Sequence, residues 1–333
     1  MAARSDRAKV TILKALHEIG RAAGSSRIVR RLGDLGMPLQ PRTVRLYLQQ
    51  LDREGLTRFM GRRIGREITD RGIEELARSH VIEKVGFIAA KVDTLGYRMS
   101  FSNRVGSGTI VANVALFDQR VLRLALKEIE EVFAAGLGMG RLLALAQEGG
   151  KLADLEVPAG RVAVATICSV TVNGILLHEG IPVTSRFGGL LEMRDGAPVR
   201  FVELIDYSGT TLDPLEAFIR AGMTDVRQCA RTGAGIIGAS FREIPSAAVE
   251  DVTRIERSMR ERGLGGILAI GSPNRPLLDI PVAEGRAGII VVGGLNPVAA
   301  VHESGIRLSM LSLAGLDDIA RFEVYENVCR QRA

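Results

Sequence analysis

The sequence has no tryptophan, only three cysteines and only four histidines in 333 residues. Cys168, Cys229 and Cys329 lie far apart and form no C-x-x-C pair, and the histidines are scattered. This spacing is not that of a zinc site, nor is it the cysteine framework of a small secreted protein. We therefore expect a protein of a reducing, cytoplasmic compartment that holds no metal and no cofactor.

Long apolar runs and an amino-terminal leader are also missing. Charged residues interrupt the apolar runs well before the roughly 18 residues that a membrane span needs. The first ten residues carry charges with no apolar segment behind them, so we predict no signal peptide and no membrane partner. With 46% hydrophobic and 25% charged residues, the chain has the composition of a soluble globular protein of two or three domains.

An excess of positive charge is present in the first quarter of the chain and absent from the rest. Residues 1–80 contain 17 lysines and arginines against 9 acidic residues, a balance of +8, whereas the remainder has 27 against 29. A basic module joined to a nearly neutral body indicates that one domain alone binds a polyanion.

This basic module, residues 1–78, has the pattern of a winged helix-turn-helix domain. Apolar residues recur at helical spacing in residues 8–20, 25–37 and 41–55, with serines to cap the second helix and Pro41 at the start of the third. Two short strands, residues 56–60 and 64–69, follow with a basic tip between them. The third helix is the one that enters the DNA major groove in such domains.

The DNA contacts follow from this arrangement. The third helix directs Arg42, Thr43, Arg45 and Gln49 outward, where they can reach base edges. The hairpin supplies phosphate contacts from Arg58, Arg62, Arg63 and Arg66. Two other interpretations remain open, namely a small helical domain with a solvated basic face and a winged helix that binds protein.

The body of the chain contains an internal duplication. "GSGTIVANV" from Gly106 resembles "GAGIIGASF" from Gly233 at an offset of 127, and each is followed by an amphipathic helical stretch that ends in Gly-Leu-Gly. We predict an α+β fold in which a connecting helix over residues 79–97 leads to a pseudo-twofold, α/β-sandwich-like regulatory domain over residues 98–330. Its halves cover about 100–185 and 230–310, each as strand, helix, strand, turn and strand.

Three candidate catalytic or cofactor patterns are weak. Cys168 and His178 could form a nucleophile and base, but Cys168 lies in an apolar strand typical of a buried thiol. The pairs His178-Glu179 and His302-Glu303 offer too few metal ligands. "GLGMG" from Gly136 follows a helix, whereas a dinucleotide-binding turn follows a strand.

The stretch from Cys168 to Gly189 is better suited to binding a small anion. It offers hydroxyls, an amide and one guanidinium, and "DYSGTT" at residues 206–211 adds hydroxyls before a helix capped by Asp213. The candidate effector-binding residues are Thr171, Asn173, Thr184, Ser185, Arg186, Ser208, Thr210 and Thr211. Alternatively, the hydroxyls stabilise turns and Arg186 pairs with Glu192 or Asp195.

The sequence resembles the NrpR family of nitrogen regulatory repressors over essentially its whole length. The resemblance lies in "EKVGFIAAKVD", "ICSVTVNGILLHEGIPVTSRFGG", "VRFVELIDYSGTTLDPLEAFIRAGMTDV", "GAGIIGASFREIP" and "GGLNPVAAVHESGI". It implies a winged-helix repressor, a homodimer or higher homo-oligomer, that binds a palindromic operator of nitrogen-assimilation genes. It also implies that 2-oxoglutarate, as an effector and not a cofactor, weakens DNA binding. Some members carry two regulatory domains in tandem, whereas this chain carries one.

The hypothesis that joins these observations places 2-oxoglutarate between the two halves of the body. Binding there would favour a subunit arrangement in which the winged helices no longer match adjacent major grooves, which requires different affinities for the two arrangements. The alternatives are an enzyme acting on a small anionic metabolite with an accessory winged helix, and a regulator that responds to a different small anion.

Overall fold

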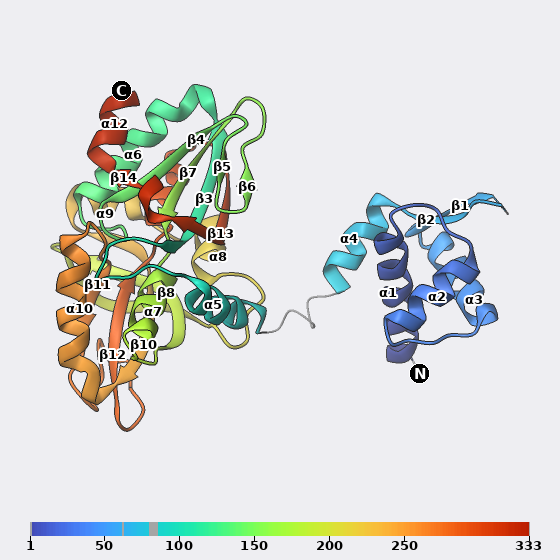
Figure 1. Cartoon of the computed structure of the whole chain (residues 1–333), viewed down its shortest axis with the longest axis horizontal. Coiled ribbons are helices and arrows are strands. Elements are labelled where there is room, and N and C mark those ends of the chain that lie inside the picture. The colour runs from blue at the N-terminus through green and yellow to red at the C-terminus, as the bar shows by residue number, and fades with distance from the viewer. Residues whose placement is uncertain (1, 62, 80–85, 333) are drawn as a thin grey trace. The chain divides into compact units, whose positions relative to one another are not determined.

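The computed structural model describes residues 2–61, 63–79 and 86–332, and the chain divides into two compact units over residues 1–84 and 85–333 (Figure 1). We call them the DNA-binding unit and the regulatory unit, after the functions that the sequence predicts for them. The first is a winged helix-turn-helix and the second a mixed α/β unit with antiparallel sheets, which confirms the predicted fold class.

The DNA-binding unit contains α1 (Ala2–Ile19), α2 (Ser25–Asp34), α3 (Pro41–Arg53), the hairpin β1 (Thr57–Gly61) and β2 (Gly65–Ile68), and α4 (Asp70–Ser79). Its core is formed by the apolar faces of the first three helices, including Ile12, Ile28 and Leu48, which are at most 1% exposed. Pro41 begins α3 as predicted. The serine cap of α2 is wrong, because Gly24 is the N-cap residue and makes no side-chain hydrogen bond.

Two features of this unit were not predicted. Ala23, between α1 and α2, exchanges backbone hydrogen bonds of 2.8 and 3.0 Å with Arg66 of β2, so the hairpin is anchored to the helices by a single antiparallel β-bridge. Helix α4 packs against α1 through Leu76. The proximity of Ala23 also explains Gly65, since a Cβ there would lie 2.2 Å from the Ala23 carbonyl carbon.

The predicted connecting helix begins later than expected. Helix α5 runs over Phe87–Arg98, and Gly86 before it adopts a φ of +76°, which ends the helical path on its amino-terminal side. Ile88, Val92 and Leu95 face the core as predicted. Ile82 and Val85, also placed on that face, lie outside the described residues.

The regulatory unit is built from two repeats whose elements correspond in order. The first contains β3 (Thr109–Asp118), α6 (Leu122–Ala134), β4 (Leu142–Gln147), β7 (Arg161–Ile167), α7 (Val170–His178) and β8 (Thr184–Arg194). The second contains β10 (Gly235–Pro245), α10 (Val249–Glu261), β11 (Ile267–Ile270), β12 (Arg286–Val292), α11 (Asn296–Glu303) and β13 (Leu308–Asp318). Each half therefore has a second helix, α7 or α11, that the predicted pattern lacked.

The last strand of each repeat is exchanged. The two five-stranded sheets have the orders β13-β3-β7-β4-β14 and β11-β12-β10-β8-β9, so β13 completes the sheet of the first repeat and β8 that of the second (Figure 1). The remaining elements are β9 (Ala197–Asp206), the hairpin β5 (Lys151–Leu152) and β6 (Leu155–Glu156), α8 (Pro214–Arg220), α9 (Val226–Thr232), β14 (Glu323–Val324) and α12 (Tyr325–Arg332). A single hydrophobic core includes residues of both repeats.

Helices α5 and α7 approach closely through two glycines. A Cβ on Gly174 would lie 2.0 Å from the Met99 sulfur and 2.8 Å from the Gly96 carbonyl oxygen. A Cβ on Gly96 would meet its nearest atom at 3.7 Å, an ordinary van der Waals distance. The two glycines thus differ in whether they tolerate a side chain.

We predict that Gly174→Ala lowers the free energy of unfolding by about 1–3 kcal/mol, because the added methyl group overpacks this contact. Gly96→Ala is the matched control, and we expect it to be neutral or to stabilise by up to about 1 kcal/mol through helix propensity. Urea unfolding of both variants checks this. Equal effects of the two substitutions would contradict the close packing of α5 on α7.

Candidate functional site

Helix α3 presents the predicted base-reading residues on its outer face. Arg42, Arg45 and Gln49 are exposed and Thr43 is half-buried, while Val44, Leu48 and Leu51 on the opposite face are buried. Together with exposed Leu46, the four predicted residues line one surface hollow. The apolar spacing in the sequence therefore predicted correctly which face of α3 is buried and which is exposed.

The β1–β2 hairpin, residues 57–68, forms the wing, and its arginines differ in exposure and in ion pairing. The Arg58 side chain is 67% exposed and pairs with Glu67 of the facing strand at 2.6 Å, and Arg63 is exposed at the tip. Arg66 is only 17% exposed and pairs with Asp52 of α3 at 2.7 Å, with its guanidinium over the Phe59 ring. Its contacts fix the wing against α3. Arg62 lies outside the described residues.

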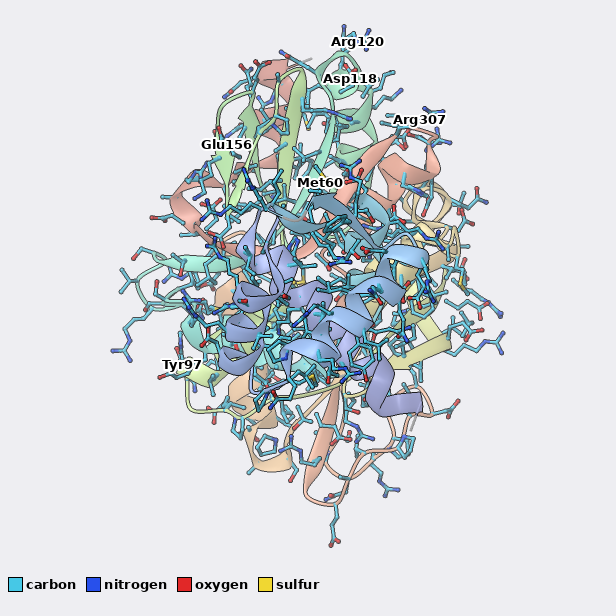
Figure 2. All side chains as sticks on the ribbon, turned by 90° about the vertical axis from the view of Figure 1, so that its right-hand side faces the viewer. Met60, Tyr97, Asp118, Arg120, Glu156 and Arg307 are labelled. Carbon is cyan, nitrogen blue, oxygen red and sulfur yellow. The ribbon has the colours of Figure 1, made fainter. Side chains whose placement is uncertain are left out.

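Exposed apolar side chains accompany these charges. Leu46 of α3 is 54% exposed, and Phe59, Met60 and Ile64 of the wing are also exposed. Met60 is labelled in Figure 2. Apolar side chains at such positions can contact thymine methyl groups or sugars, a contribution that charge patterning does not reveal.

In the regulatory unit, Asn173 and Ser185 come together. The Asn173 side chain is buried near the start of α7 and donates to the Ser185 hydroxyl of β8 at 3.0 Å. Thr171, another candidate effector-binding residue, is fully buried. Its hydroxyl accepts from the Val111 N–H and donates to the Val111 carbonyl, at 3.2 Å each. Thr171 therefore joins α7 to β3, and its hydroxyl proton is already donated within this link.

The centre of this cluster is an arginine that the sequence analysis missed. Arg242 of β10 is 1% exposed, and its guanidinium donates to the Ser169 carbonyl and hydroxyl at 2.8 Å each and to the Asn173 side-chain oxygen. Its Nε has no hydrogen-bond partner. Burial lowers the pKa of this guanidinium. The available signal was an arginine in the apolar strand "GIIGASFREIP".

Arg186 lies on the same strand as Ser185 but is already paired. Its guanidinium donates to the buried carboxylate of Glu243 at 2.6 Å, not to Glu192 or Asp195 as the alternative interpretation had it. Glu192 instead accepts from Arg194 and Arg200.

Thr184 belongs to the same surface cluster. Its hydroxyl accepts from the Arg286 guanidinium at 2.8 Å, and Arg286 also approaches Glu243 at 3.8 Å. Arg186, Glu243, Arg286 and Thr184 therefore satisfy one another, and the predicted effector residues Thr184 and Arg186 lie apart from the neutral acceptors around Arg242.

The turn over residues 206–211 is closed by its own hydrogen bonds. The Ser208 N–H donates to Asp206 at 2.6 Å, and the Thr210 hydroxyl donates to the Leu212 carbonyl at 2.6 Å. Thr211 is half-buried. For Thr210, this hydrogen bonding matches the alternative in which the hydroxyls stabilise turns.

The sequence suggested that an anion could bind at the amino-terminal end of the next helix, α8. The structure contradicts this expectation. Asp213 caps α8 by accepting from the N–H groups of Leu215 and Glu216 at 3.1 and 3.0 Å, so a carboxylate already occupies this helix end. Glu216, three residues after Asp213, also has the spacing of a capping-box acid, but its carboxylate instead accepts from Ser312 of β13 and pairs with Arg220.

The Cys168 and His178 pair is not a catalytic pair. Cys168 is buried before α7, and His178 is exposed at the last residue of this nine-residue helix, roughly 12 Å further along its axis. Burial raises the pKa of the Cys168 thiol to about 12, so it is not a thiolate at neutral pH.

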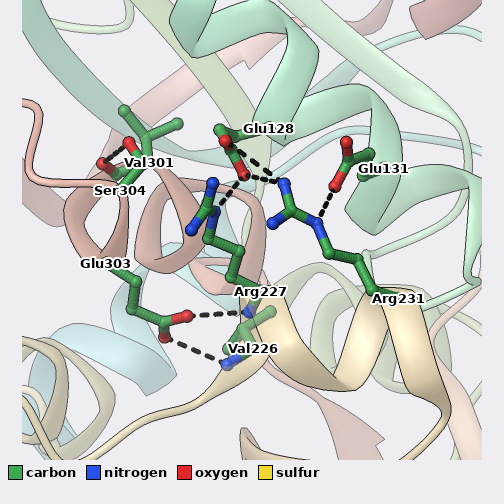
Figure 3. A network of polar contacts seen from close by, with 8 residues as sticks. All are labelled: Glu128, Glu131, Val226, Arg227, Arg231, Val301, Glu303 and Ser304. Carbon is green, nitrogen blue, oxygen red and sulfur yellow. Dashed lines mark hydrogen bonds and ion pairs between the residues drawn. The ribbon is translucent and has the colours of Figure 1, made fainter.

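His302-Glu303 is likewise not a metal site. The Glu303 carboxylate accepts from the N–H groups of Val226 and Arg227 at 3.0 and 2.7 Å and so caps α9, as Figure 3 shows. Among the described residues, no group of three or more histidine, cysteine or acidic side chains could hold a metal ion.

The "GLGMG" glycines lie beside the second Gly-Leu-Gly at a hollow of about 490 Å³. Gly136 ends α6 with a φ of +72°, and Gly140 packs against the Gly263 carbonyl. The two arginines that line this hollow are already paired, Arg141 with Glu326 and Arg260 with Glu256. Gly136 thus ends the helix, which is the role that the sequence favoured over a nucleotide loop, and Gly140 in addition packs against the second repeat.

No helix within residues 2–61, 63–79 and 86–332 is long and apolar enough to cross a membrane.

These features define a winged-helix unit joined to a duplicated regulatory unit, and comparison with known proteins identifies the family. The family model described as NrpR regulatory domains NRD1 and 2 matches residues 85–324, and that of the ribonuclease R winged-helix domain matches residues 10–76. The chain belongs to the NrpR family, which confirms the resemblance seen in the sequence.

Curated relatives have names that agree with this family. The chain is 32% identical to the global nitrogen regulator NrpRI of Methanosarcina mazei, over 91% of this chain and 93% of that protein. It is 32% identical to the global nitrogen regulator NrpR of Methanococcus maripaludis over 94% of this chain, and 30% identical to that of Methanocaldococcus jannaschii over 93%. This chain spans about half, 54%, of each of the latter two.

A solved structure resembles the fold. The crystal structure of a nitrogen repressor-like protein from Methanococcus jannaschii matches with a TM-score of 0.61 at 26% identity. The match covers 71% of this chain and 97% of that one.

Asp213 gives a pH-dependent prediction. Burial raises its pKa in the folded protein to about 6, so the folded state binds more protons than the unfolded state between about pH 4 and pH 6. The contribution of Asp213 to stability therefore falls as pH rises through this window. Asp213→Asn keeps the capping oxygen and removes the buried charge.

We expect Asp213→Asn to raise the free energy of unfolding at pH 7 by about 1–3 kcal/mol and to leave it nearly unchanged at pH 4. Urea unfolding of both proteins at pH 4, 5, 6 and 7 checks this. A difference that is constant with pH would show that Asp213 is not neutral at low pH.

Proposed function

We propose that this chain is a DNA-binding transcriptional regulator of nitrogen-assimilation genes that acts as a repressor and is released from its operator by 2-oxoglutarate. The observation that carries the DNA-binding part is the outer face of α3, where Arg42, Arg45 and Gln49 stand exposed in the unit that holds the chain's excess positive charge. The names of the relatives support the nitrogen-related part.

The regulator interpretation is favoured over an enzyme. The catalytic pair that the sequence offered is separated by a helix, and the thiol is buried with a raised pKa. The family names and the winged helix agree with a regulator. We propose a homodimer or higher homo-oligomer, because a palindromic operator is matched by a protein with twofold symmetry.

The effector part of the proposal is supported by the polar cluster around Asn173, Ser185 and Arg242. 2-Oxoglutarate is a dianion with a keto group, and it needs a cation and several hydrogen-bond donors. It would release DNA by binding more tightly to the arrangement of subunits that does not fit the operator. An affinity ratio typical of allosteric coupling would weaken DNA binding about 5- to 150-fold.

The role of α3 as the recognition helix, which enters the DNA major groove, is tested by Arg45→Ala. We expect this substitution to weaken binding to operator DNA by about 1–3 kcal/mol if Arg45 contacts a base, with a smaller effect on unrelated DNA. The matched control is Arg71→Ala, which removes the same charge from α4, the helix that packs on α1. Fluorescence anisotropy at fixed salt measures both. Equal losses would show that only overall charge matters.

The effector is tested by titrating the complex of wild-type protein and promoter DNA with 2-oxoglutarate, succinate and glutamate at constant ionic strength. We expect 2-oxoglutarate alone to release the DNA, because only it combines two carboxylates with a keto oxygen. Release by all three to the same extent would indicate charge screening, and release by none would refute 2-oxoglutarate as the effector.

A further inference from the structure

We propose that Arg242 is the anion-binding residue of the regulatory unit and that it receives a carboxylate of a small dicarboxylate ligand. This inference rests on the proposed function, since it names the site at which the effector acts. It starts from a buried cation whose partners are all neutral. They are the Ser169 carbonyl, the Ser169 hydroxyl and the Asn173 side-chain oxygen.

A buried guanidinium in such surroundings is unusual. Desolvating a charge is costly unless an opposite charge and hydrogen bonds compensate it. Two other arginines of this unit illustrate the usual pairing with a carboxylate. Arg120 pairs with Asp118 at 2.7 Å at the surface (Figure 2), and Arg227 pairs with Glu128 at 2.8 Å (Figure 3). Within the described residues, Arg242 takes part in no ion pair, and its Nε donates to nothing.

The duplication shows that the fold does not require this arginine. Strand pairing makes Ala115 of β3 the equivalent of Arg242, because Ala115 lies between Val164 of β7 and Met310 of β13, as Arg242 lies between Ile289 of β12 and Ser185 of β8. Alanine and methionine fill this place in the first repeat, and both are buried. Arginine and serine fill it in the second. One of two equivalent core positions has thus been made polar and cationic.

Arg242 is also close to a cavity, through its partner Asn173. Asn173, which accepts from Arg242, lines a cavity of about 300 Å³ between α5, α7 and the segment of Pro182 and Val183. Leu177 and Pro182 give its wall an apolar surface that suits a short methylene chain, and Asp93 is an exposed residue of the lining. A ligand with a carboxylate at one end could reach the guanidinium by displacing the Asn173 oxygen.

The test compares wild type with Arg242→Met, Arg242→Lys and the control Arg227→Met in the full chain. Thermal unfolding and calorimetry are measured without added anion and with 2-oxoglutarate, succinate or glutamate. We expect an anion to raise the melting temperature of wild type. We expect this shift to be lost in Arg242→Met, to need at least ten-fold more anion in Arg242→Lys, which lacks the guanidinium fork, and to persist in Arg227→Met.

The unliganded proteins give a second readout. We expect Arg242→Met to melt no lower than wild type, because an uncompensated buried charge is replaced by an apolar side chain, whereas Arg227→Met should melt lower because it leaves Glu128 with fewer partners. If Arg242→Met does not fold, Arg242→Lys decides, and wild-type anion affinity in that variant would overturn the inference.

The remaining outcomes separate this inference from the proposed function. If 2-oxoglutarate releases DNA equally from wild type and Arg242→Met, the function stands and Arg242 is not the site. If succinate or glutamate, but not 2-oxoglutarate, gives an Arg242-dependent shift, the site stands and the proposed effector falls. If none of the three anions shifts wild type, the inference is overturned.

Discussion

The regulatory unit depends on the exchange of one strand between its two repeats. Strand β8 leaves the first repeat to pair with β10, and β13 leaves the second to pair with β3. Neither repeat keeps its own last strand, so each sheet is completed only when the other repeat is present. The single hydrophobic core is a consequence of this exchange.

The same exchange assembles the polar cluster. Arg242 comes from the second repeat, whereas Ser169, Asn173 and Ser185 come from the first, and the pairing of β8 with β10 brings them together. The polar cluster, where we propose that the effector binds, therefore lies between the two halves of the body. Helix α7, which carries Asn173, also packs on α5 through Gly174. Helix α7 therefore connects the polar cluster to α5, the first helix of the regulatory unit.

Some arginines of the DNA-binding unit hold its elements together, and others stay exposed on the helix that we propose reads DNA. Arg66 pairs with Asp52 of α3 and stacks on Phe59, which holds the wing at a set position relative to the recognition helix. Arg42 and Arg45 remain exposed beside exposed Leu46. Local basic charge points to the domain, but which arginines are paired depends on the acidic residues that the fold places beside them.

The sequence by itself determined the helical stripes of the DNA-binding unit, the start of α3 at Pro41, the duplication and the family. These are local or periodic features, because side-chain periodicity, proline geometry and repeated segments are fixed by neighbours along the chain. Tertiary structure alone decided that Arg186 pairs with Glu243 and that the Thr171 hydroxyl donates to Val111. It also decided that Arg242 is buried without a carboxylate partner. The partners of these side chains lie 57 or more residues away in sequence, and strand exchange, which periodicity does not encode, sets which of them meet.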